Sequence, residues 1–499
     1  MNSQKRDLSP SSILNFLNEL EKEFPVSKWK LFGFHIWPVI RIALGLKLSQ
    51  ESFLKEKNQL TSTNSSVISD SLQTIYNSLY NSISDSSNNQ SLKKKYRIIF
   101  LNASSTRYYK LGEKWFNPFS DSFINYLEKE NFNSLVLEYP DTVKKNPRYR
   151  PSKYIGAGIN LMNVNVLFQK QFEKAEHFKP EGFDDFLKRV NLPMDFFLKK
   201  ILRVLNYSAL YEKILKRTKP SLVIVEGFYS YIAMGLLLAA KRNEIKTIDI
   251  QHGVQSENDF LFSNWINIPN NGYELLPDIF WCWSNVEKEN IDKWIVNSDN
   301  LYSAFTGGNP VLEINFGDEH IQRFQSQISE EKNKSSKNIL YTHQASFEIS
   351  ELLIDVIHNS PKDWKWWFRF HPQYPDAQGK ILAKLAKYNF KNVITQNVTE
   401  YPLSLILKNM DLHVTEFSST VLEAEMMGVP SILLSETGAD LFNKQIESGI
   451  AKYSPNKESF FEDAAAIVEK RDIEFLNNNG DNFKAGIEMI KKIVREKKN

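Results

Sequence analysis

Short apolar runs alternate with longer amphipathic stretches along two successive parts of this 499-residue chain. The runs are rich in β-branched and aromatic residues and lie a helix's length apart, which is the pattern of parallel strands joined by right-handed crossovers. Parallel strands are buried on both faces, and ligands bind where their carboxyl ends meet. The alternation therefore predicts an α/β fold whose functional residues directly follow the strands.

The first series of expected strands begins near residue 98 and the second near residue 338. The expected strands are 98–101, 134–138, 221–225, 247–250, 279–283 and 302–305 in the first series, and 338–341, 366–370, 393–394, 412–414 and 431–434 in the second. A turn with two Gly and one Pro at 306–310 separates the series. We expect an amino-terminal domain over 93–308, a carboxy-terminal domain over 309–480 and a basic helix over 481–499.

Residues 1–92 precede both series and are expected to form a helical extension followed by a linker. The linker, rich in Ser and Asn from residue 61 to 89, is either a mobile loop or a poorly packed helix pair. Segment 31–48 is apolar but contains His35, Arg41 and other polar residues, so it is too polar to span a membrane. It predicts a buried helical hairpin, with a helix lying at a lipid surface as the alternative.

Composition and charge exclude several classes of partner and site for this chain. A net charge of +3 is small for this length, and no nucleic-acid-binding motif is present, so we expect no nucleic-acid partner. Cys282 is the only cysteine, which excludes an intramolecular disulfide and a thiolate metal cluster. The start of the chain has no secretory signal pattern, which favours a cytoplasmic protein. Peripheral contact with the membrane, through segment 31–48 or the basic end 487–498, stays an alternative.

Candidate catalytic and acceptor-binding residues follow the strands of the first series. Glu226 follows four apolar residues and precedes Gly227, so its carboxylate is placed to act as general base on a sugar hydroxyl. The alternative is a Glu that orients a loop or caps a helix. His252 follows the next strand and is expected to orient the acceptor or assist at a phosphate. The loops after two strands supply the expected acceptor-binding residues Ser104, Ser105, Arg107 and Gln251.

Candidate nucleotide-binding residues follow the strands of the second series. His371, the third expected catalytic residue, directly follows the strand 366–370, is held by Pro372, and is placed to donate a hydrogen bond to a leaving phosphate. Hydroxyl groups at the start of the helix 419–427 predict a phosphate site that needs no metal. Glu423 would lie one turn into that helix, facing ribose hydroxyls. The expected nucleotide-binding residues are Thr342, His343, His371, Pro372, Ser418, Ser419, Thr420 and Glu423.

Two groups of these residues carry a family resemblance over about residues 97–480. Glu423 with the Gly428 and Pro430 that follow resembles the nucleotide-binding half of GT-B glycosyltransferases. The pairs 226–227, 371–372 and 418–419 together resemble inverting bacterial sialyltransferases, polysialyltransferases and capsular Kdo transferases. In one departure, Val225 stands where sialyltransferases often carry a second acidic residue.

The resemblance implies a GT-B fold, in which two Rossmann-like domains face each other across a cleft. The expected N-terminal helical extension, residues 1–92, is not covered by the resemblance. It also implies an inverting, metal-independent glycosyltransferase that moves a CMP-activated nonulosonic acid or Kdo to a glycan or lipid-linked glycan. Such enzymes work in bacterial surface-polysaccharide synthesis at the inner face of the cytoplasmic membrane. No cofactor is expected, and no Asp-x-Asp metal motif is present, since the adjacent pair Asp184 and Asp185 lacks that spacing.

Three alternatives stay open at this point. CDP-glycerol polyol phosphotransferases also pair a His-Pro motif with a downstream Ser-Ser motif. A GT-B enzyme with another nucleotide sugar would share the second-domain residues. An inactive GT-B-like carbohydrate-binding subunit would keep the fold without turnover.

Overall fold

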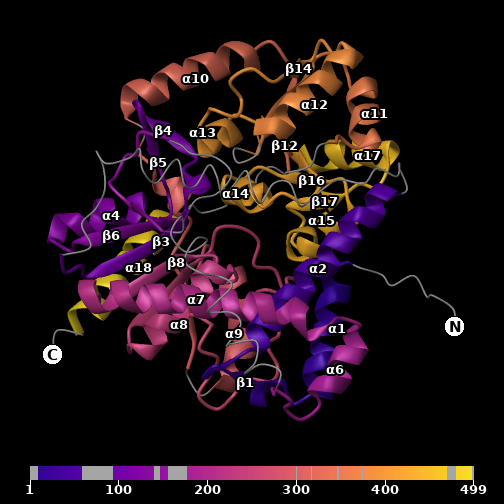
Figure 1. The fold of residues 1–499 in the computed structure, drawn as a ribbon. Helices are drawn as coiled ribbons and strands as arrows, with labels where there is room; N and C mark the ends of the chain where they lie inside the picture. The colour runs from indigo at the N-terminus through magenta and orange to yellow at the C-terminus, as the bar shows by residue number, and fades with distance from the viewer. Residues whose placement is uncertain are drawn as a thin grey trace, which may run out of the picture. The chain divides into compact units, whose positions relative to one another are not determined.

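The computed structural model describes residues 9–58, 94–139, 146–155, 177–298, 301–315, 317–344, 348–371, 375–468 and 479–496. The chain divides into two compact units (Figure 1). The first unit contains residues 1–313 and 479–499, and the second contains residues 314–478. The C-terminal helix therefore belongs to the first unit.

A seven-stranded parallel sheet forms the centre of the first unit, in the order β11-β10-β9-β8-β3-β6-β7. The two central strands, β3 and β8, are buried along their whole length, as their largely apolar sequences predict. The strands are β3 (Ile98–Ala103), β6 (Ser134–Tyr139), β7 (Lys153–Tyr154), β8 (Leu222–Glu226), β9 (Lys246–Ile250), β10 (Ile279–Cys282) and β11 (Ser303–Thr306). After β3 the chain first adds β6 and β7 on one side of β3. It then crosses to the other side and adds β8 to β11. The carboxyl ends of β3 and β8 thus lie at the switch point of this sheet.

Helices and short turns surround this sheet. The helices are α1 (Pro10–Glu23), α2 (Trp37–Asn58), α4 (Asp121–Leu127), α6 (Phe183–Val190), α7 (Met194–Thr218), α8 (Tyr231–Arg242), α9 (Asn285–Ile295) and α18 (Asn479–Glu496). The 3-10 turns are η1 (Val26–Lys28), η3 (Ser104–Thr106), η4 (Glu128–Glu130), η5 (Val296–Ser298) and η6 (Pro310–Glu313). Two hairpins complete the unit: β1 (Lys30–Leu31) with β2 (Phe34–His35), and β4 (Tyr109–Leu111) with β5 (Lys114–Phe116).

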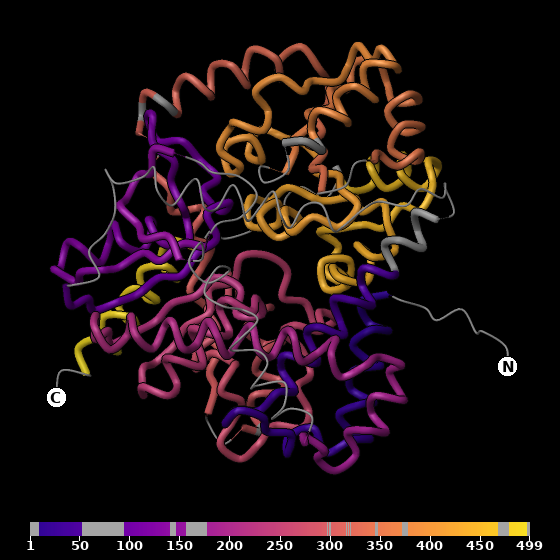
Figure 2. Tube along the Cα trace, viewed as in Figure 1, coloured from indigo at the N-terminus to yellow at the C-terminus, as the bar shows by residue number. Residues whose placement is uncertain are grey.

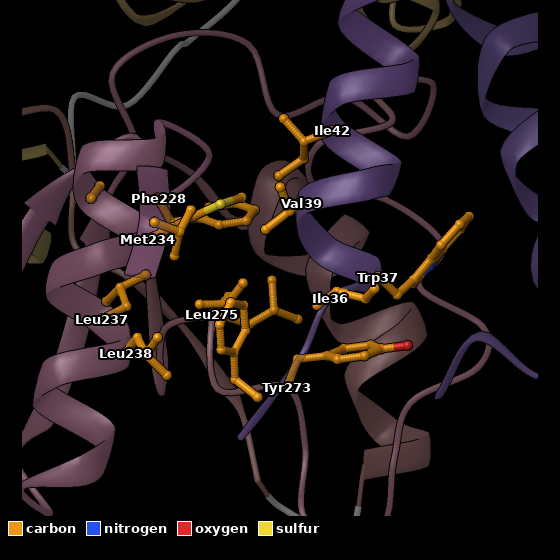
Figure 3. Packing of buried hydrophobic residues seen from close by; sticks show 14 of the residues in the cluster. Ile36, Trp37, Val39, Ile42, Phe228, Met234, Leu237, Leu238, Tyr273 and Leu275 are labelled. Atoms are coloured by element: carbon orange, nitrogen blue, oxygen red, sulfur yellow. The ribbon is translucent and has the colours of Figure 1, made fainter. Parts of the chain in front are cut away.

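Segment 31–48 lies inside the core of the first unit. Its first part is a β-hairpin rather than the first arm of the expected helical hairpin, because Phe32 and Gly33 adopt positive φ and turn the chain sharply. Helix α2 then places apolar side chains against α8 and the loop 273–275, as Figure 3 shows. Burial of this segment is therefore confirmed. In the described residues no helix is long and apolar enough to cross a membrane, and the linker 61–89 lies outside them.

A buried ion pair fastens this N-terminal segment to the loop after β9. Arg41 pairs with Glu21, and its Nη2 donates to the Ser263 carbonyl at 2.7 Å. Glu21 accepts in addition from the backbone N–H groups of Ile266 (2.7 Å) and Asn267 (3.0 Å). Because each partner of the buried pair is also hydrogen-bonded to backbone, the charges are compensated.

Helix α18 packs on the elements of the first unit (Figure 2). The centroid of the Phe483 ring lies 4.9 Å from that of the tilted Phe123 ring and 5.7 Å from that of Trp281, which it meets edge to face. A Cβ on Gly486 would lie 2.2 Å from the Trp281 ring, so only glycine fits there. On the other face Lys491 and Arg495 both pair with Glu130. The apolar face of this basic helix is thus covered by the protein itself.

The second unit has a six-stranded parallel sheet in the order β14-β13-β12-β15-β16-β17. Its strands are β12 (Lys337–His343), β13 (Trp364–Phe370), β14 (Val393–Ile394), β15 (Leu412–Thr415), β16 (Ser431–Leu433) and β17 (Ala451–Tyr453). Its helices are α10 (Asp318–Lys332), α11 (Glu351–Asn359), α12 (Pro375–Tyr388), α13 (Leu403–Lys408), α14 (Thr420–Met426), α15 (Glu436–Leu441), α16 (Asn443–Glu447) and α17 (Lys457–Val468). The switch point lies between β12 and β15. The prediction of two parallel α/β sheets is confirmed.

Candidate functional site

Glu226 lies at the switch point of the first sheet. It is the last residue of β8, it is 6% exposed, and its Oε2 lies 3.0 Å from Oγ1 of Thr106. Thr106 ends the turn η3, which directly follows β3. Gly227 adopts a φ of +74°, which favours glycine, and turns the chain away immediately after the carboxylate. The switch point thus brings together a carboxylate and a hydroxyl from residues 120 positions apart.

An amide and a carboxyl group hold Thr106 in place. Nδ2 of Asn117 donates to Thr106 Oγ1 at 2.9 Å, while Oδ1 of Asn117 accepts from the Phe119 N–H at 2.9 Å. The Asn117 N–H donates to Oδ2 of Asp121 at 2.8 Å. Burial raises the pKa of Asp121 to about 7, against lowering by this N–H and by the positive charges of Arg107 and Arg150.

A histidine and a tyrosine lie beside Glu226. Nε2 of His252, which follows β9, is 2.9 Å from the hydroxyl of Tyr229. Burial lowers the pKa of His252 to about 4 and raises the pKa of Tyr229 well above its usual value, so both are neutral at pH 7. The nearby negative charge of Glu226 also contributes to the rise in the pKa of Tyr229. A Cβ on Gly227 would lie 3.0 Å from Cε1 of His252, so the ring packs directly on the turn that follows the carboxylate.

Asp249 braces this turn from the neighbouring strand. It is fully buried in β9, and its Oδ1 accepts from the Phe228 N–H at 2.9 Å. Burial raises the pKa of Asp249 well above its usual range, although the N–H groups of Phe228 and Gly227 oppose this rise. A buried acid beneath the turn 227–228 therefore fixes the backbone that carries Glu226.

The other residues expected to bind the acceptor are engaged within the fold. Arg107 pairs with the buried Glu138 and donates to the Trp115 carbonyl at 3.3 Å. Gln251 donates to the Gly253 carbonyl at 2.8 Å and accepts from the Trp283 N–H at 2.6 Å. Ser104 and Ser105 are buried within η3. Arg107 and Gln251 thus hold the loops around Glu226, whereas Thr106, Asn117, Tyr229 and Asp249 were not singled out from the sequence.

At the second switch point, a carboxylate, a phenol and an imidazole form a connected series. Glu416 follows β15, and its Oε2 accepts from the Tyr341 hydroxyl at 2.5 Å while its Oε1 accepts from the Ser350 hydroxyl at 3.0 Å. The Tyr341 oxygen lies 3.2 Å from Nδ1 of His343. Because the phenol donates its one hydrogen to Glu416, it accepts from His343, which makes Nδ1 the protonated nitrogen. The series orients the imidazole at the carboxyl end of β12.

The hydroxyl residues after β15 also lie at this switch point. Ser418 Oγ donates to Thr420 Oγ1 at 3.1 Å and accepts from the Thr420 N–H at 3.3 Å. Ser419 occupies the N-cap position of α14, and its side chain forms no capping hydrogen bond. Glu423 is buried in the first turn of this seven-residue helix. An ordinary N-cap therefore does not explain the second serine.

His371 and Thr342 have different surroundings. His371 directly follows β13 and is half-buried, while Pro372 lies outside the described residues. Thr342 Oγ1 lies 2.8 Å from Nε2 of His413, whose Nδ1 is 2.9 Å from the Ser431 hydroxyl. Burial lowers the pKa of His413 to about 3, so this series across the sheet is neutral. The Thr342 hydroxyl is thus hydrogen-bonded to a buried residue of the neighbouring strand β15. Among the described residues, no group of three His, Cys, Asp or Glu is arranged to hold a metal.

Several solved structures share this fold. UDP-GlcNAc 2-epimerase from Neisseria meningitidis bound to UDP-GlcNAc has 15% identity and a TM-score of 0.50, covering 79% of this chain and 100% of that one. The S. aureus MnaA structure with UDP has 13% identity and a TM-score of 0.50, covering 80% and 97%. The wall teichoic acid polymerase TagF has 13% identity and a TM-score of 0.44, covering 92% and 99%.

No protein-family model matches the sequence, and no curated protein is significantly similar to it. At these identities the structural likeness shows the fold alone, which is GT-B-like: two Rossmann-like units, each built on a parallel sheet. The Neisseria meningitidis epimerase holds UDP-GlcNAc and the S. aureus MnaA structure holds UDP, so both of these neighbours bind a uridine nucleotide.

Proposed function

We propose that this protein is an inverting glycosyltransferase that transfers a sugar from a nucleotide donor to a glycan acceptor. The observation that carries the proposal is the buried carboxylate of Glu226 at the first switch point, hydrogen-bonded to Thr106 at 3.0 Å. Carboxyl ends at a switch point are where ligands bind in such sheets. A carboxylate at this position is placed to act as a general base. It is hydrogen-bonded to a hydroxyl, and Asp249 fixes the turn that follows it.

We assign a different role in the reaction to the residues of each unit. In the first, Glu226 takes the proton of an acceptor hydroxyl as its oxygen bonds to the anomeric carbon of the donor. The bond from that carbon to the phosphate oxygen breaks, and its electron pair leaves with the nucleotide, so the anomeric configuration inverts. His252 is neutral at pH 7 and is suited to orient the acceptor by hydrogen bonds rather than by charge.

The second unit binds the nucleotide in this proposal. His343, His371, Ser418 and Ser419 supply donors that stabilise the negative charge on the leaving phosphate, which is the usual role of preorganised donors in transfer reactions. Glu423 accepts from ribose hydroxyls. No metal takes part in the step, so a chelator leaves the rate unchanged.

The proposed donor is a CMP-linked nonulosonic acid or Kdo, and the proposed acceptor is a glycan or lipid-linked glycan of a bacterial surface polymer, at the cytoplasmic face of the membrane. The support for this choice is the combination of 226–227, 371–372 and 418–419, which resembles the transferases that use CMP-sugars. A CDP-polyol phosphotransferase is the second candidate, because the His-Pro and Ser-Ser pairs fit it equally well.

A nucleotide screen tests the donor class. The purified chain is heated with CMP, CDP, UDP or GDP, since a ligand at 100 times its Kd stabilises a protein by about 2.7 kcal/mol. We expect CMP to give the largest rise in Tm. A larger rise with CDP favours the polyol phosphotransferase. A larger rise with UDP contradicts the CMP-sugar donor, and conversion of UDP-GlcNAc without an acceptor would indicate an epimerase like the structural neighbours.

A further inference from the structure

The hydroxyl of Thr106 has one hydrogen and two acceptors within hydrogen-bonding distance. Its Oγ1 lies 2.8 Å from the carbonyl oxygen of Ala103 and 3.0 Å from Oε2 of Glu226. A hydroxyl donates one hydrogen bond and accepts two. The hydrogen therefore points to one of these two oxygens at a time.

The third partner of Thr106 has only one possible role. Oδ1 of Asn117 accepts from the Phe119 N–H at 2.9 Å, so the amide orientation is set and Nδ2 is the atom that faces Thr106 at 2.9 Å. An amide NH₂ group only donates. One lone pair of Thr106 is thus occupied by Asn117, which leaves one lone pair and one hydrogen for Ala103 and Glu226.

These constraints allow two arrangements, one for each protonation state of Glu226. When Glu226 is ionised, the Thr106 hydrogen points to the carboxylate, because otherwise two oxygen lone pairs would face each other at 3.0 Å. When Glu226 is protonated on Oε2, the carboxyl donates to the remaining Thr106 lone pair, and the Thr106 hydrogen points to Ala103 at 2.8 Å. A rotation about one C–O bond interconverts the arrangements, and in each of them the Thr106–Glu226 contact is a hydrogen bond.

We propose that Thr106 is a positioning residue that reverses its hydrogen bond to Glu226 each time Glu226 gains or loses a proton. This proposal rests on the assignment of Glu226 as the general base. Thr106 keeps the carboxyl group in one place before and after it takes the acceptor proton. Asn117, itself anchored through its N–H to Asp121 at 2.8 Å, keeps Thr106 from moving as the hydroxyl turns.

A hydroxyl whose hydrogen stays on the Ala103 carbonyl gives the opposite response to mutation. If the Thr106 hydrogen always pointed to Ala103, Thr106 would only accept from Glu226 and would favour the protonated acid. Loss of the hydroxyl would then make Glu226 ionise at lower pH. In the reversing arrangement the ionised form loses a hydrogen bond to a charged acceptor, which is about twice as strong as a neutral one. Loss of the hydroxyl then makes Glu226 ionise at higher pH.

Other titratable groups lie on the elements around Glu226. Tyr229 lies in the turn after β8, Asp249 and His252 lie in and after β9, Asp121 begins α4, and Arg107 follows η3. At pH 7 Tyr229 and His252 are neutral, whereas the pKa of Asp121 is about 7. Asp121→Asn keeps an acceptor for the Asn117 N–H and identifies any part of the pH profile that belongs to Asp121.

The test is the pH dependence of kcat/KM in three Thr106 variants and a control. In Thr106→Val we expect the acidic limb of the kcat/KM profile to shift to higher pH by about one pH unit. In Thr106→Ser we expect this limb to lie at the wild-type pH. Thr106→Ala repeats the valine result without added bulk. Thr218→Val removes a buried hydroxyl that donates to the Ile214 carbonyl at 2.7 Å, away from the switch point, and should leave the limb in place. A downward shift or no shift in Thr106→Val overturns the proposal.

An infrared titration separates this proposal from the proposed function. The carbonyl band of protonated Glu226 appears in pH-difference spectra and is identified by its loss in Glu226→Gln. We expect Thr106→Val, but not Thr218→Val, to shift this band and to raise its titration midpoint. If these shifts occur while no transfer is found, the proposed function fails and the Thr106 assignment stands. If transfer is found and the midpoint does not rise, the Thr106 assignment fails.

Discussion

The hydroxyl of Tyr229 lies 2.9 Å from Nε2 of His252, and both residues are neutral at pH 7 because they are buried. Tyr229 lies three residues after Glu226, so this pair belongs to the turn that carries the proposed base. Nε2 of this neutral imidazole either accepts from the phenol, which puts the ring proton on Nδ1, or donates to the phenol. We propose that Tyr229 donates and so fixes the tautomer of His252.

Tyr229→Phe is expected to raise the KM for the acceptor by about tenfold, the equivalent of one hydrogen bond of about 1.4 kcal/mol. Steady-state kinetics at fixed donor concentration measure this change. The affinity for the nucleotide should be unchanged, because that role is assigned to the second unit. A change in nucleotide affinity with an unchanged acceptor KM would contradict the assignment.

Tyr341→Phe tests the series of Glu416, Tyr341 and His343. The variant removes the group that donates to Glu416 at 2.5 Å and accepts from His343, so the imidazole loses its orientation. We expect nucleotide affinity to fall by about tenfold, measured by calorimetric titration with CMP. Tyr388→Phe, at an exposed position of the same unit, is the matched control and should bind CMP as the wild type does. Equal affinity of Tyr341→Phe and wild type would exclude His343 from the nucleotide site.

Gly438→Ala tests how closely the chain approaches Glu416. A Cβ at Gly438 would lie 2.0 Å from the Glu416 carbonyl oxygen, so the backbone must shift. We expect a loss of about 1–3 kcal/mol in unfolding free energy together with weaker CMP binding. Gly379 lies within α12 with nothing within 4 Å of an added Cβ. Gly379→Ala should instead stabilise by about 0.5–1 kcal/mol, and destabilisation by both changes in equal measure would refute the close contact.

Because Asp121 is buried, we expect the free energy of unfolding to fall as pH rises. Its pKa is about 7 in the folded protein against an ordinary value of 3.8, so the unfolded chain loses this proton first. The stabilisation is fully present below pH 3.8 and is lost as pH rises to about 7, with a slope of at most about 1.4 kcal/mol per pH unit. Asp121→Asn should therefore gain stability relative to wild type between pH 4 and 7.

Urea unfolding at several pH values measures this difference. Asp184→Asn, at an exposed position, serves as control and should follow the wild-type pH dependence. Asp259 also has a pKa raised to about 7 by burial, so part of the slope should persist in Asp121→Asn. A wild-type slope retained in full in Asp121→Asn would contradict the burial of its carboxyl group.

Periodicity and residue type were enough to predict the two parallel sheets and the location of Glu226 and His371 at strand ends. The expected strand 221–225 is β8, shifted by one residue, and Glu226 closes it. The order of strands was not predictable in this way. It is the pairing of β3 with β8 that places Thr106 beside Glu226, and this pairing depends on contacts between distant residues.

The sequence pattern also did not predict which side chains contact one another. Arg107 follows a strand, as a ligand-binding residue does, but its guanidinium forms an ion pair with the buried Glu138 of β6. Likewise residues 479–496 return to the first unit, where Phe483 packs against both Phe123 and Trp281, and local sequence does not reveal these contacts. Thr106 was not singled out from the sequence, because its partner Glu226 lies 120 residues further along the chain.

The central claim is that Glu226 removes the proton of the acceptor during sugar transfer. The most direct test compares transfer from a CMP-linked donor by the wild type and Glu226→Gln, with both proteins first shown to bind CMP equally. The account predicts that Glu226→Gln lowers kcat by about 10²–10⁴-fold and that a chelator changes neither rate. Undiminished transfer by Glu226→Gln would contradict it.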